Sequence, residues 1–248
     1  MNKKRLAILT GGKEGLGREL QKELILNGFN IISIDINYKK NRKYISKGKI
    51  VIEIKKDVCS KNLVTILNNI IIKNKFEFCI FINNAGIAHQ SKFLDLKIKK
   101  HLQIIKVNNL AIINLSHFAL KKLNKTGTLV NIGSSTAFQP LTNFSVYSSS
   151  KIFLDYFTRI IQTEYKHKNI LLVHPSGFKS NFNKSGNIKI KNIKLQETEK
   201  VAKKIIKGIF DNEKILLIGF RSKIIYLFSR LVPISLQIKF WNLILNKL

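Results

Sequence analysis

Short apolar runs that are rich in β-branched residues alternate with longer amphipathic stretches along almost the whole chain. The apolar runs occupy residues 6–9, 30–35, 49–54, 78–82, 128–133, 169–174 and 215–220. Helical patterns separate them at residues 14–27, 60–73, 96–122, 147–166 and 197–210. Because the runs are mainly apolar and show no regular polar–apolar alternation, both of their faces should be buried under helices. The sequence therefore predicts an α/β fold, with a seven-stranded, mainly parallel, doubly wound sheet and helices on both faces.

Nothing in the sequence divides this pattern into two units. The 248 residues include only three prolines and no Ser/Gly-rich linker, so residues 1–221 are predicted to form one domain. Residues 222–248 are predicted to form an amphipathic helical tail in which Lys223, Tyr226 and Arg230 share one helical face and Pro233 separates two segments. The tail has two interpretations. Its helices cover the pocket or a subunit interface, or they lie on the cytoplasmic face of a membrane.

The chain is strongly basic, with 44 Lys and Arg against 14 Asp and Glu and a formal net charge of +30. These charges are spread along the whole sequence, which favours a solvated surface over a specific nucleic-acid site. Cys59 and Cys79 form no CxxC pair and the five histidines lack metal-ligand spacing, so we expect neither a disulfide framework nor a metal. The first apolar run is too short for a signal peptide, and no run reaches the length of a membrane span. We therefore expect a cytoplasmic protein, which the second interpretation of the tail makes peripheral to a membrane.

A glycine cluster lies between the first apolar run and the first helical pattern. It contains Thr10, Gly11, Gly15 and Gly17. Glycines at such a turn let the backbone approach a pyrophosphate, and the helix start directs its free N–H groups and its positive dipole end towards the anion. Asp35, eighteen residues after Gly17, ends the second apolar run, where an acid can accept hydrogen bonds from an adenosine ribose. The alternative for Asp35 is a turn residue that only ends a strand.

Three motifs in order resemble the short-chain dehydrogenase/reductase family, whose fold is a Rossmann-type domain. The first is the T-G-x-x-x-G-x-G spacing of residues 10–17, and the second is the Asn-Asn-Ala-Gly sequence of residues 83–86. The third is the S-(x12)-Y-x-x-x-K arrangement of Ser134, Tyr147 and Lys151. Ser135 adjoins Ser134, and the thirteen-residue spacing to the tyrosine favours Ser134. The resemblance covers about residues 5–220.

The resemblance implies a set of site residues. Those implied to bind a dinucleotide cofactor are Thr10, Gly11, Gly15, Leu16, Gly17, Asp35, Asp57, Val58, Asn84, Ala85, Gly86, Tyr147, Lys151, Pro175 and Ser180. Those implied to be catalytic are Asn108, Ser134, Tyr147 and Lys151. In the family the serine binds the substrate oxygen, and the asparagine holds a water that links the lysine to solvent. NAD is the first choice of cofactor and NADP the second, because Glu14 and Ile36 stand where NADP-binding members carry basic residues.

The residue types also suit this chemistry on physical grounds. Tyr147 and Lys151, four residues apart, project from one helical face. A cationic Lys151 beside the phenol should favour phenolate and lower the pKa of Tyr147, which suits a general acid or base near neutral pH. The alternative for this pair alone is a surface Tyr and Lys on an amphipathic helix.

We therefore predict an NAD(P)-dependent oxidoreductase that interconverts a secondary alcohol and a ketone. The substrate stays open between an acyl thioester, a sterol- or retinoid-like lipid and a sugar-like alcohol. The resemblance also implies a homodimer or homotetramer through the helices at 96–122 and 147–166. Two rivals remain: a non-catalytic NAD(P)-binding regulator or membrane-associated module, and a nucleic-acid binder suggested by charge alone.

Overall fold

The structure, a computed structural model, describes residues 4–178 and 195–246. Eight strands form one sheet in the order β3-β4-β2-β1-β5-β6-β7-β8. The strands are β1 (Lys4–Thr10), β2 (Asn30–Asp35), β3 (Arg42–Ser46), β4 (Lys49–Lys55), β5 (Phe76–Asn83), β6 (Thr128–Ile132), β7 (Asn169–Pro175) and β8 (Ile215–Ile218). All neighbouring strands run parallel except β3 and β4. The predicted doubly wound, mainly parallel sheet is confirmed.

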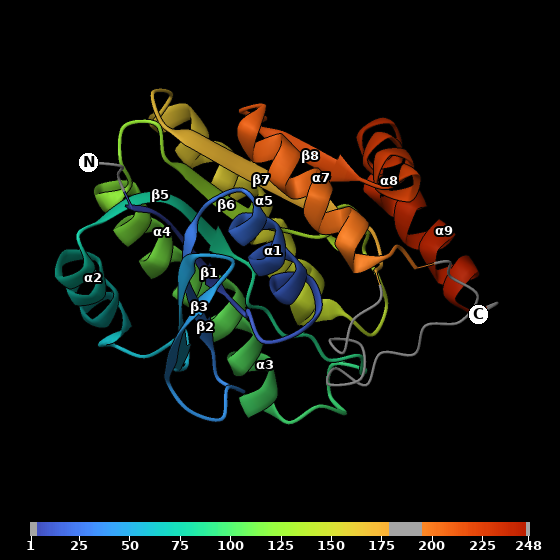
Figure 1. Ribbon diagram of the computed structural model, residues 1–248. Helices are drawn as coiled ribbons and strands as arrows, with labels where there is room; N and C mark the ends of the chain where they lie inside the picture. The colour runs from blue at the N-terminus through green and yellow to red at the C-terminus, as the bar shows by residue number, and fades with distance from the viewer. Residues whose placement is uncertain (1–3, 179–194, 247–248) are drawn as a thin grey trace.

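Helices cover both faces of this sheet (Figure 1). The helices are α1 (Gly15–Leu26), α2 (Leu63–Asn74), α3 (Ile98–Ile105), α4 (Ala111–Lys122), α5 (Ser145–Glu164), α7 (Thr198–Phe210), α8 (Phe220–Leu231) and α9 (Ile234–Asn246). On one face, Leu20 of α1 and Ile205 of α7 pack in the same cluster as Leu9 of β1. On the other face, Leu115 of α4 packs in a second cluster with Ile8 of β1. Adjacent β1 residues thus enter opposite cores, which explains why the run is apolar throughout.

The strand order changes direction at β1. From β1 the chain passes to β2 on one side, whereas β5 pairs with the other side of β1. In open α/β sheets, a crevice opens beyond the carboxyl ends of the strands at such a switch point. The glycine turn after β1, Asp35 at the end of β2 and Asn84 after β5 therefore all come to this edge of the sheet.

The predicted strand number of seven is wrong, because β3 is an eighth strand. Its sequence, Arg-Lys-Tyr-Ile-Ser, lacks an apolar run because it lies at the sheet edge, where much of it is exposed to solvent. Lys47 and Gly48 both have positive φ, 46° and 72°, as a two-residue turn between antiparallel strands requires. Glu53 of β4 then fixes the strand by accepting hydrogen bonds from Arg42 and Tyr44.

The long helical pattern at 96–122 is interrupted in its middle. A π-helical turn, η1 (Lys106–Leu110), separates α3 from α4 and contains Asn108. Isolated π turns inside α-helices recur at functional sites because they re-aim side chains. Here the turn directs the Asn108 side chain to Ile87 and Ser150, on two other segments.

The two tail helices of the prediction are present as α8 and α9, at one end of the molecule (Figure 1). Pro233 lies between them, as expected. The boundary expected at residues 221 and 222 falls inside the first turn of α8, which begins at Phe220. Within the described residues, no helix has both the length and the apolar character that crossing a membrane requires.

Candidate active site

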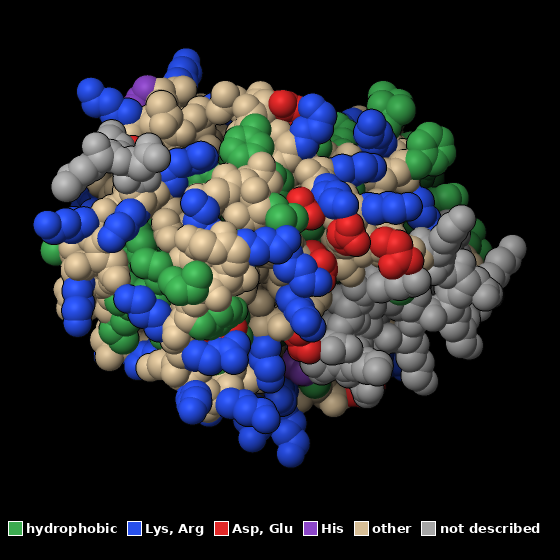
Figure 2. All heavy atoms as spheres, viewed as in Figure 1, with side chains coloured by type: hydrophobic (Ala, Val, Ile, Leu, Met, Phe, Trp, Pro, Cys, Tyr) green, Lys and Arg blue, Asp and Glu red, His purple; other side chains and the backbone are tan. Residues whose placement is uncertain are grey.

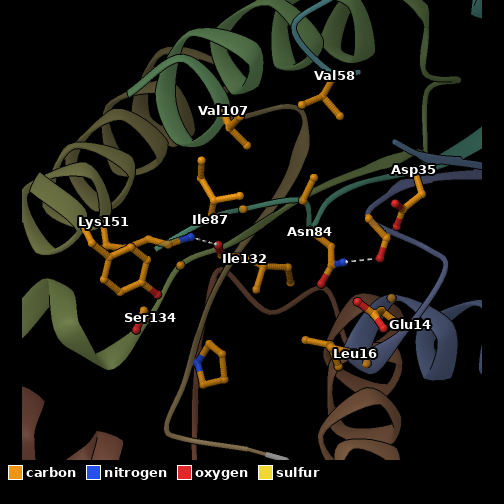
Figure 3. A pocket seen from close by; sticks show the side chains of 18 of the residues that line it. Glu14, Leu16, Asp35, Val58, Asn84, Ile87, Val107, Ile132, Ser134 and Lys151 are labelled. Atoms are coloured by element: carbon orange, nitrogen blue, oxygen red, sulfur yellow. Dashed lines mark hydrogen bonds between the residues drawn. The ribbon is translucent and has the colours of Figure 1, made fainter. Parts of the chain in front are cut away.

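A cleft of about 480 Å³ opens at the carboxyl edge of the sheet. Most of the site residues predicted from the sequence line it: Gly11, Gly15, Leu16, Gly17, Asp35, Asp57, Val58, Asn84, Ala85, Gly86, Ser134, Tyr147, Lys151 and Pro175. Thr10 and Asn108 are buried outside the lining, and Ser180 lies outside the described residues. In Figure 3, Ser134 and Lys151 occupy one end of the cleft, and Glu14 and Asp35 the other.

Hydrogen bonds connect the glycine turn to the segment after β5. The Thr10 hydroxyl accepts hydrogen bonds from the backbone N–H groups of Asn84 and Ala85, and the Asn84 amide donates to the carbonyls of Thr10 and Gly11 (Figure 3). Gly11 has a φ of 68°, and a Cβ there would lie 3.0 Å from the Cα of Ala85. A side chain at position 11 would therefore push these two segments apart. Thr10 supports the floor of the cleft instead of lining it.

One end of the cleft is acidic in an otherwise basic chain. Asp35 is almost fully buried, and its two carboxylate oxygens accept the backbone N–H groups of Lys13 and Asn37 at 3.0 and 2.8 Å. The Lys13 ammonium points to the Asn37 carbonyl at 2.6 Å. Glu14, Ile36 and Lys56 also line the cleft, and the backbone N–H of Lys56 donates to the Asp35 carbonyl. The carboxylate is thus held in place with acceptor capacity left for a ligand hydroxyl.

The opposite end brings together Ser134, Tyr147 and Thr136. Ser134 follows β6, and its hydroxyl accepts hydrogen bonds from the backbone N–H and the hydroxyl of Thr136. Burial raises the pKa of Tyr147, and hydrogen bonds with Ser134 and Thr136 offset only part of this rise. Thr136 carries no recognisable sequence signal, because it lies in a short 3-10 turn, η2 (Ser135–Phe138), outside the three motifs.

The pKa of Tyr147 is therefore shifted in the direction opposite to our expectation from the sequence. The Lys151 ammonium donates to the Ile132 carbonyl at 3.0 Å and lies 6.0 Å from the centre of the Tyr147 ring (Figure 3). Burial also lowers the pKa of Lys151 to about 8. Both groups thus respond mainly to the loss of water, which disfavours the phenolate and the ammonium alike.

Asn108 is fully buried behind the cleft, where it joins three segments. Its side-chain oxygen accepts the Ile87 N–H, and its amide donates to the Ile87 carbonyl and the Ser150 hydroxyl, all within 3.0 Å. A Cβ on Gly86 would lie 3.4 Å from this oxygen and 3.8 Å from the Lys151 ammonium. Asn108 therefore holds the Gly86–Ile87 segment against α5 next to Lys151.

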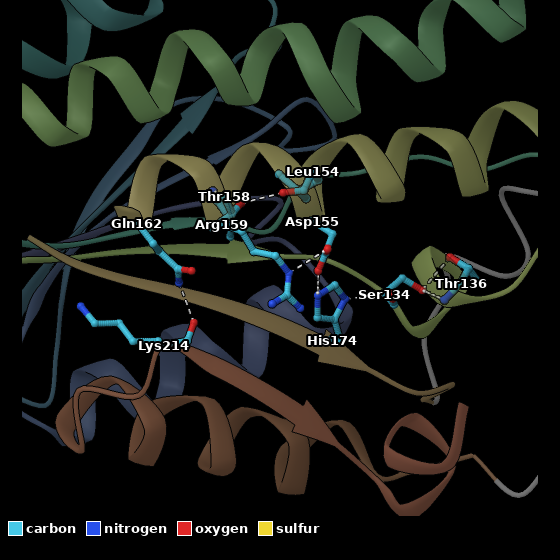
Figure 4. A network of polar contacts seen from close by, with 10 residues as sticks. Ser134, Thr136, Leu154, Asp155, Thr158, Arg159, Gln162, His174 and Lys214 are labelled. Atoms are coloured by element: carbon cyan, nitrogen blue, oxygen red, sulfur yellow. Dashed lines mark hydrogen bonds and ion pairs between the residues drawn. The ribbon is translucent and has the colours of Figure 1, made fainter. Parts of the chain in front are cut away.

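A buried charged network lies directly behind Ser134 (Figure 4). One ring nitrogen of His174 is 3.0 Å from the Ser134 carbonyl, and the other is 2.9 Å from the Asp155 carboxylate. Because a carbonyl and a carboxylate only accept hydrogen bonds, the ring nitrogens are the donors in these two contacts. Arg159 donates to the other Asp155 oxygen at 2.8 Å. Burial alone would raise the pKa of Asp155, but His174 and Arg159 lower it overall.

The cleft fits an extended dinucleotide. The N-terminus of α1 faces it through Gly15, Leu16 and Gly17, where N–H groups and the helix dipole favour a pyrophosphate. Asp35 lies at one end, where an adenosine ribose would donate to it, and the absence of a Cβ on Gly86 leaves room beside Lys151 at the other. The lining therefore suits the phosphates in the middle and one ribose at each end.

The doubly wound sheet and a cleft with Ser134, Tyr147 and Lys151 at one end define the class of short-chain dehydrogenases. A model of the family described as short chain dehydrogenase matches residues 5–191, which are 187 of the 248 residues. The chain belongs to this family.

Curated relatives share about a quarter to a third of the aligned residues. "Putative steroid dehydrogenase 4" of Caenorhabditis elegans is 28% identical over 67% of this chain and 68% of its own length. "Very-long-chain 3-oxoacyl-CoA reductase" of Rattus norvegicus is 28% identical over 67% of this chain and 56% of its length. "Inactive hydroxysteroid dehydrogenase-like protein 1" of Pongo abelii is 30% identical over 68% of this chain and 53% of its length. The chain spans little more than half the length of the latter two.

Solved structures of short-chain dehydrogenases share the fold. A short-chain dehydrogenase/reductase from Burkholderia phymatum, in complex with NAD, has a TM-score of 0.79 and 14% identity over 92% of each chain. A short-chain dehydrogenase from Sphingobium yanoikuyae, in complex with NADPH, has a TM-score of 0.73 and 19% identity over 86% of this chain and 87% of its own. At these identities the likeness concerns the fold.

Proposed function

We propose that this chain is an NAD(P)-dependent oxidoreductase that interconverts a ketone and a secondary alcohol. One observation carries the proposal: Ser134, Tyr147 and Lys151 meet at one end of a cleft whose other end holds Asp35. When bound, the nicotinamide supplies the hydride that is exchanged with the carbon atom. The protein has to bind the oxygen atom and move its proton.

Tyr147 is the proposed proton donor and acceptor. A phenol whose pKa is raised by burial is protonated at neutral pH, which suits donation to a carbonyl oxygen during ketone reduction. The Ser134 hydroxyl, hydrogen-bonded to the same phenol, is placed to bind that oxygen as negative charge develops on it. In the oxidation direction, the phenol first has to release its own proton, and the phenolate oxygen then receives the alcohol proton.

Lys151 and Asn108 are proposed to support this proton transfer. A lysine whose pKa is about 8 can exchange a proton near neutral pH, and its ammonium also lies where a nicotinamide ribose would bind. Asn108 positions the Gly86–Ile87 segment and Ser150 around it. The proposed water link from Lys151 to solvent requires this arrangement.

The proposed substrate is a lipid-like ketone, such as a 3-oxoacyl thioester or a steroid. Two of the relatives are named for such substrates, a steroid dehydrogenase and a very-long-chain 3-oxoacyl-CoA reductase. Phe144, whose ring centre lies 6.1 Å from that of Tyr147, lines the cleft at this end, and Ile87 and Val107 add further apolar side chains to the lining. Apolar walls with a few polar groups are typical of sites that hold an apolar ligand by one polar end.

NAD is the proposed cofactor in preference to NADP. The fixed Asp35 carboxylate would accept hydrogen bonds from a ribose hydroxyl and repel a phosphate at the same place. Glu14 nearby adds a second negative charge. The Lys13 ammonium is occupied by the Asn37 carbonyl, so it does not neutralise Asp35 directly.

A non-catalytic NAD(P)-binding regulator is the second candidate, because one relative is named inactive. The two candidates differ in turnover and not in cofactor binding. A catalyst oxidises NADH or NADPH in the presence of a suitable ketone, whereas a regulator binds the cofactor without turnover.

The decisive test is the Tyr147→Phe variant, which removes the hydroxyl and keeps the ring. Wild-type protein is screened against 3-oxoacyl thioesters, steroid ketones and sugar-like ketones by the absorbance of NADH and NADPH. On the best substrate, Tyr147→Phe should lower kcat by about 100-fold or more while cofactor affinity stays within a factor of about three. Tyr156→Phe, at an exposed tyrosine on the same helix, is the matched control and should retain full activity. Equal kcat in wild type and Tyr147→Phe would refute the mechanism.

A further inference from the structure

Helix α8 exposes a continuous apolar stripe. Phe220, Ile224, Leu227 and Leu231 follow one another at helical spacing on one side of the helix, and between 50 and 78% of each is exposed. In a helix that packs only against its own domain, such a stripe faces the core. Figure 2 shows hydrophobic side chains at the end of the molecule where Figure 1 places α8, with Lys and Arg side chains beside them.

The inner side of α8 is instead largely polar. Ser222 is completely buried, and Tyr226 packs on Phe138 of η2 at 5.0 Å between ring centres. The Arg230 guanidinium lies over the same tyrosine ring. The stripe of Lys223, Tyr226 and Arg230 that the sequence indicated thus contributes Tyr226 to the protein side of the helix. Phe220, Ile224, Leu227 and Leu231 are left facing outward, whereas Ile225 and Phe228 are half-buried.

Helix α9 likewise buries a polar side chain and exposes apolar ones. Gln237 is buried, and its amide donates to the carbonyls of Val232 and Ser229 at the end of α8. Leu236, Phe240 and Leu243 are all exposed and share another side of the helix. Contacts of Phe228 with the rings of Phe240 and Trp241 hold the two helices together. We call the exposed side chains of both helices the tail surface: Phe220, Ile224, Leu227, Leu231, Ile234, Leu236, Ile238, Phe240 and Leu243.

The tail helices themselves carry only basic charges. Residues 214–248 contain six Lys and Arg and no Asp or Glu. A groove of about 360 Å³ adjoins the first residue of the stripe, Phe220, and is lined by Lys204, Lys207 and Lys223, with one acid, Glu213. Among the described residues, Lys204 and Lys223 have no ion-pair partner. The groove therefore offers uncompensated positive charge beside an exposed apolar ring.

We propose that the tail surface docks on a membrane that contains anionic lipids. The apolar side chains would enter the boundary between headgroups and acyl chains, and the lysines of the groove would bind the phosphates of the headgroups. A helix that lies in this boundary needs neither the length nor the all-round apolar character of a membrane span. If the proposed function holds, this placement brings lipid-borne ketones to the η2 end of the cleft, because Tyr226 contacts Phe138 four residues after Ser134.

A second copy of this chain fits the tail surface less well. Two copies that met through it would bring together only basic side chains, because no acid follows Glu213. Like charges at such a contact oppose association, whereas an anionic bilayer attracts them. Charge complementarity therefore favours the lipid surface.

Vesicle flotation of the full chain tests the apolar contacts. The probes are vesicles of phosphatidylcholine alone and of phosphatidylcholine with phosphatidylserine. We expect wild type to bind the anionic vesicles at least about tenfold more strongly than the neutral ones. Leu227→Gln with Leu231→Gln should lower this binding about tenfold or more. The matched control is Ile45→Gln with Ile72→Gln, which changes two equally exposed apolar residues elsewhere and should bind like wild type.

A second pair of variants tests the charged groove. Lys204→Glu with Lys223→Glu and Lys61→Glu with Lys125→Glu have the same formal net charge and differ only in where the charge is removed. The groove variant should lose at least about tenfold in binding to anionic vesicles, and the control less than about threefold. Equal losses would show attraction by net charge alone and overturn the assignment of the groove.

Wild-type vesicle binding by the Leu227→Gln, Leu231→Gln variant overturns the proposal as a whole. If that variant also changes its oligomeric state, measured without lipid by light scattering, the surface is a contact between copies. Because flotation requires no turnover, its result is independent of the oxidoreductase assay, and either proposal can fail alone.

Discussion

Lys151, a candidate catalytic residue, is buried at a cost in stability. Its ammonium is buried with one hydrogen bond to the Ile132 carbonyl, and the loss of hydration lowers its pKa from 10.5 to about 8. In the unfolded chain the same group is fully hydrated. A methionine of similar length would have no charge to desolvate.

This burial predicts a pH-dependent stability. Between about pH 8 and pH 10.5, unfolded Lys151 keeps a proton that the folded state releases, so the free energy of unfolding rises with pH in this window. Relative to Lys151→Met, wild type should gain on the order of 3 kcal/mol across the full window and part of it by about pH 9.5. Urea unfolding of both proteins in steps of pH measures the difference, in which other groups cancel. A difference that stays constant with pH would contradict the burial of a charged Lys151.

Asp35 predicts the cofactor preference. Because its carboxylate is fixed by two backbone N–H groups, it cannot turn away from a ribose phosphate. Wild type should bind NADH about 100-fold more tightly than NADPH, measured by titration of the reduced cofactor fluorescence. Asp35→Asn removes the charge at constant size and should abolish most of this preference. Equal or tighter NADPH binding by wild type would show that Lys39, Lys40 or Arg42 outweighs Asp35.

The sequence predicts residues that belong to fixed spacings better than residues joined only in space. Ser134, Tyr147 and Lys151 are indicated by their spacing along the chain, which resembles that of the short-chain dehydrogenase/reductase family. Asp155 and His174 lie on α5 and β7, nineteen residues apart, and no local sequence pattern predicts their contact. The pKa direction of Tyr147 was missed for a related reason, because burial depends on packing from the whole domain.

At the scale of elements, a strand is easily predicted from the sequence when both of its faces are buried. It is harder to predict when one face or edge is exposed to solvent. The six strands in the interior of the sheet have mainly apolar runs that are readily recognised in the sequence, whereas the edge strand β3 consists mainly of exposed polar residues. Its signal lay instead in Lys47-Gly48, a two-residue turn before a recognised strand. The π turn η1 is also difficult to predict from the sequence, because one extra residue per turn hardly alters the apolar pattern.

The contact between α5 and β7 predicts a large stability effect at Asp155. Asp155→Ala leaves buried His174 and the partly buried Arg159 without their carboxylate, which should cost about 3 kcal/mol of unfolding free energy in urea titrations. Glu199→Ala removes the exposed partner of Lys203 and should cost less than about 1 kcal/mol. Because His174 also donates to the Ser134 carbonyl, Asp155→Ala should lower kcat more than it changes KM. Equal losses of stability in the two variants would refute the network.

At the scale of the whole molecule, most of the positive charge lies outside the cleft of the candidate active site. The net charge is +30, yet the lining of the cleft includes three acids, Glu14, Asp35 and Asp57, against two lysines, Lys56 and Lys151. The basic surface is therefore not an extension of the cofactor site. It adds a general attraction to polyanions, which increases at low salt and needs no specific nucleic-acid partner.

The last prediction concerns assembly. Apolar side chains on the outer face of α5 are exposed, among them Ile152, Phe153, Tyr156 and Ile160, and Leu110 and Ile113 extend this apolar surface to η1 and α4. An apolar area of this kind indicates an interface, and we propose that two or four copies associate through these helices. Light scattering after gel filtration should show a dimer or tetramer for wild type and a monomer for Tyr156→Glu with Ile160→Glu, whereas Ile72→Glu on α2 should assemble like wild type. A monomeric wild type, or an unchanged assembly in the double variant, would place the interface elsewhere.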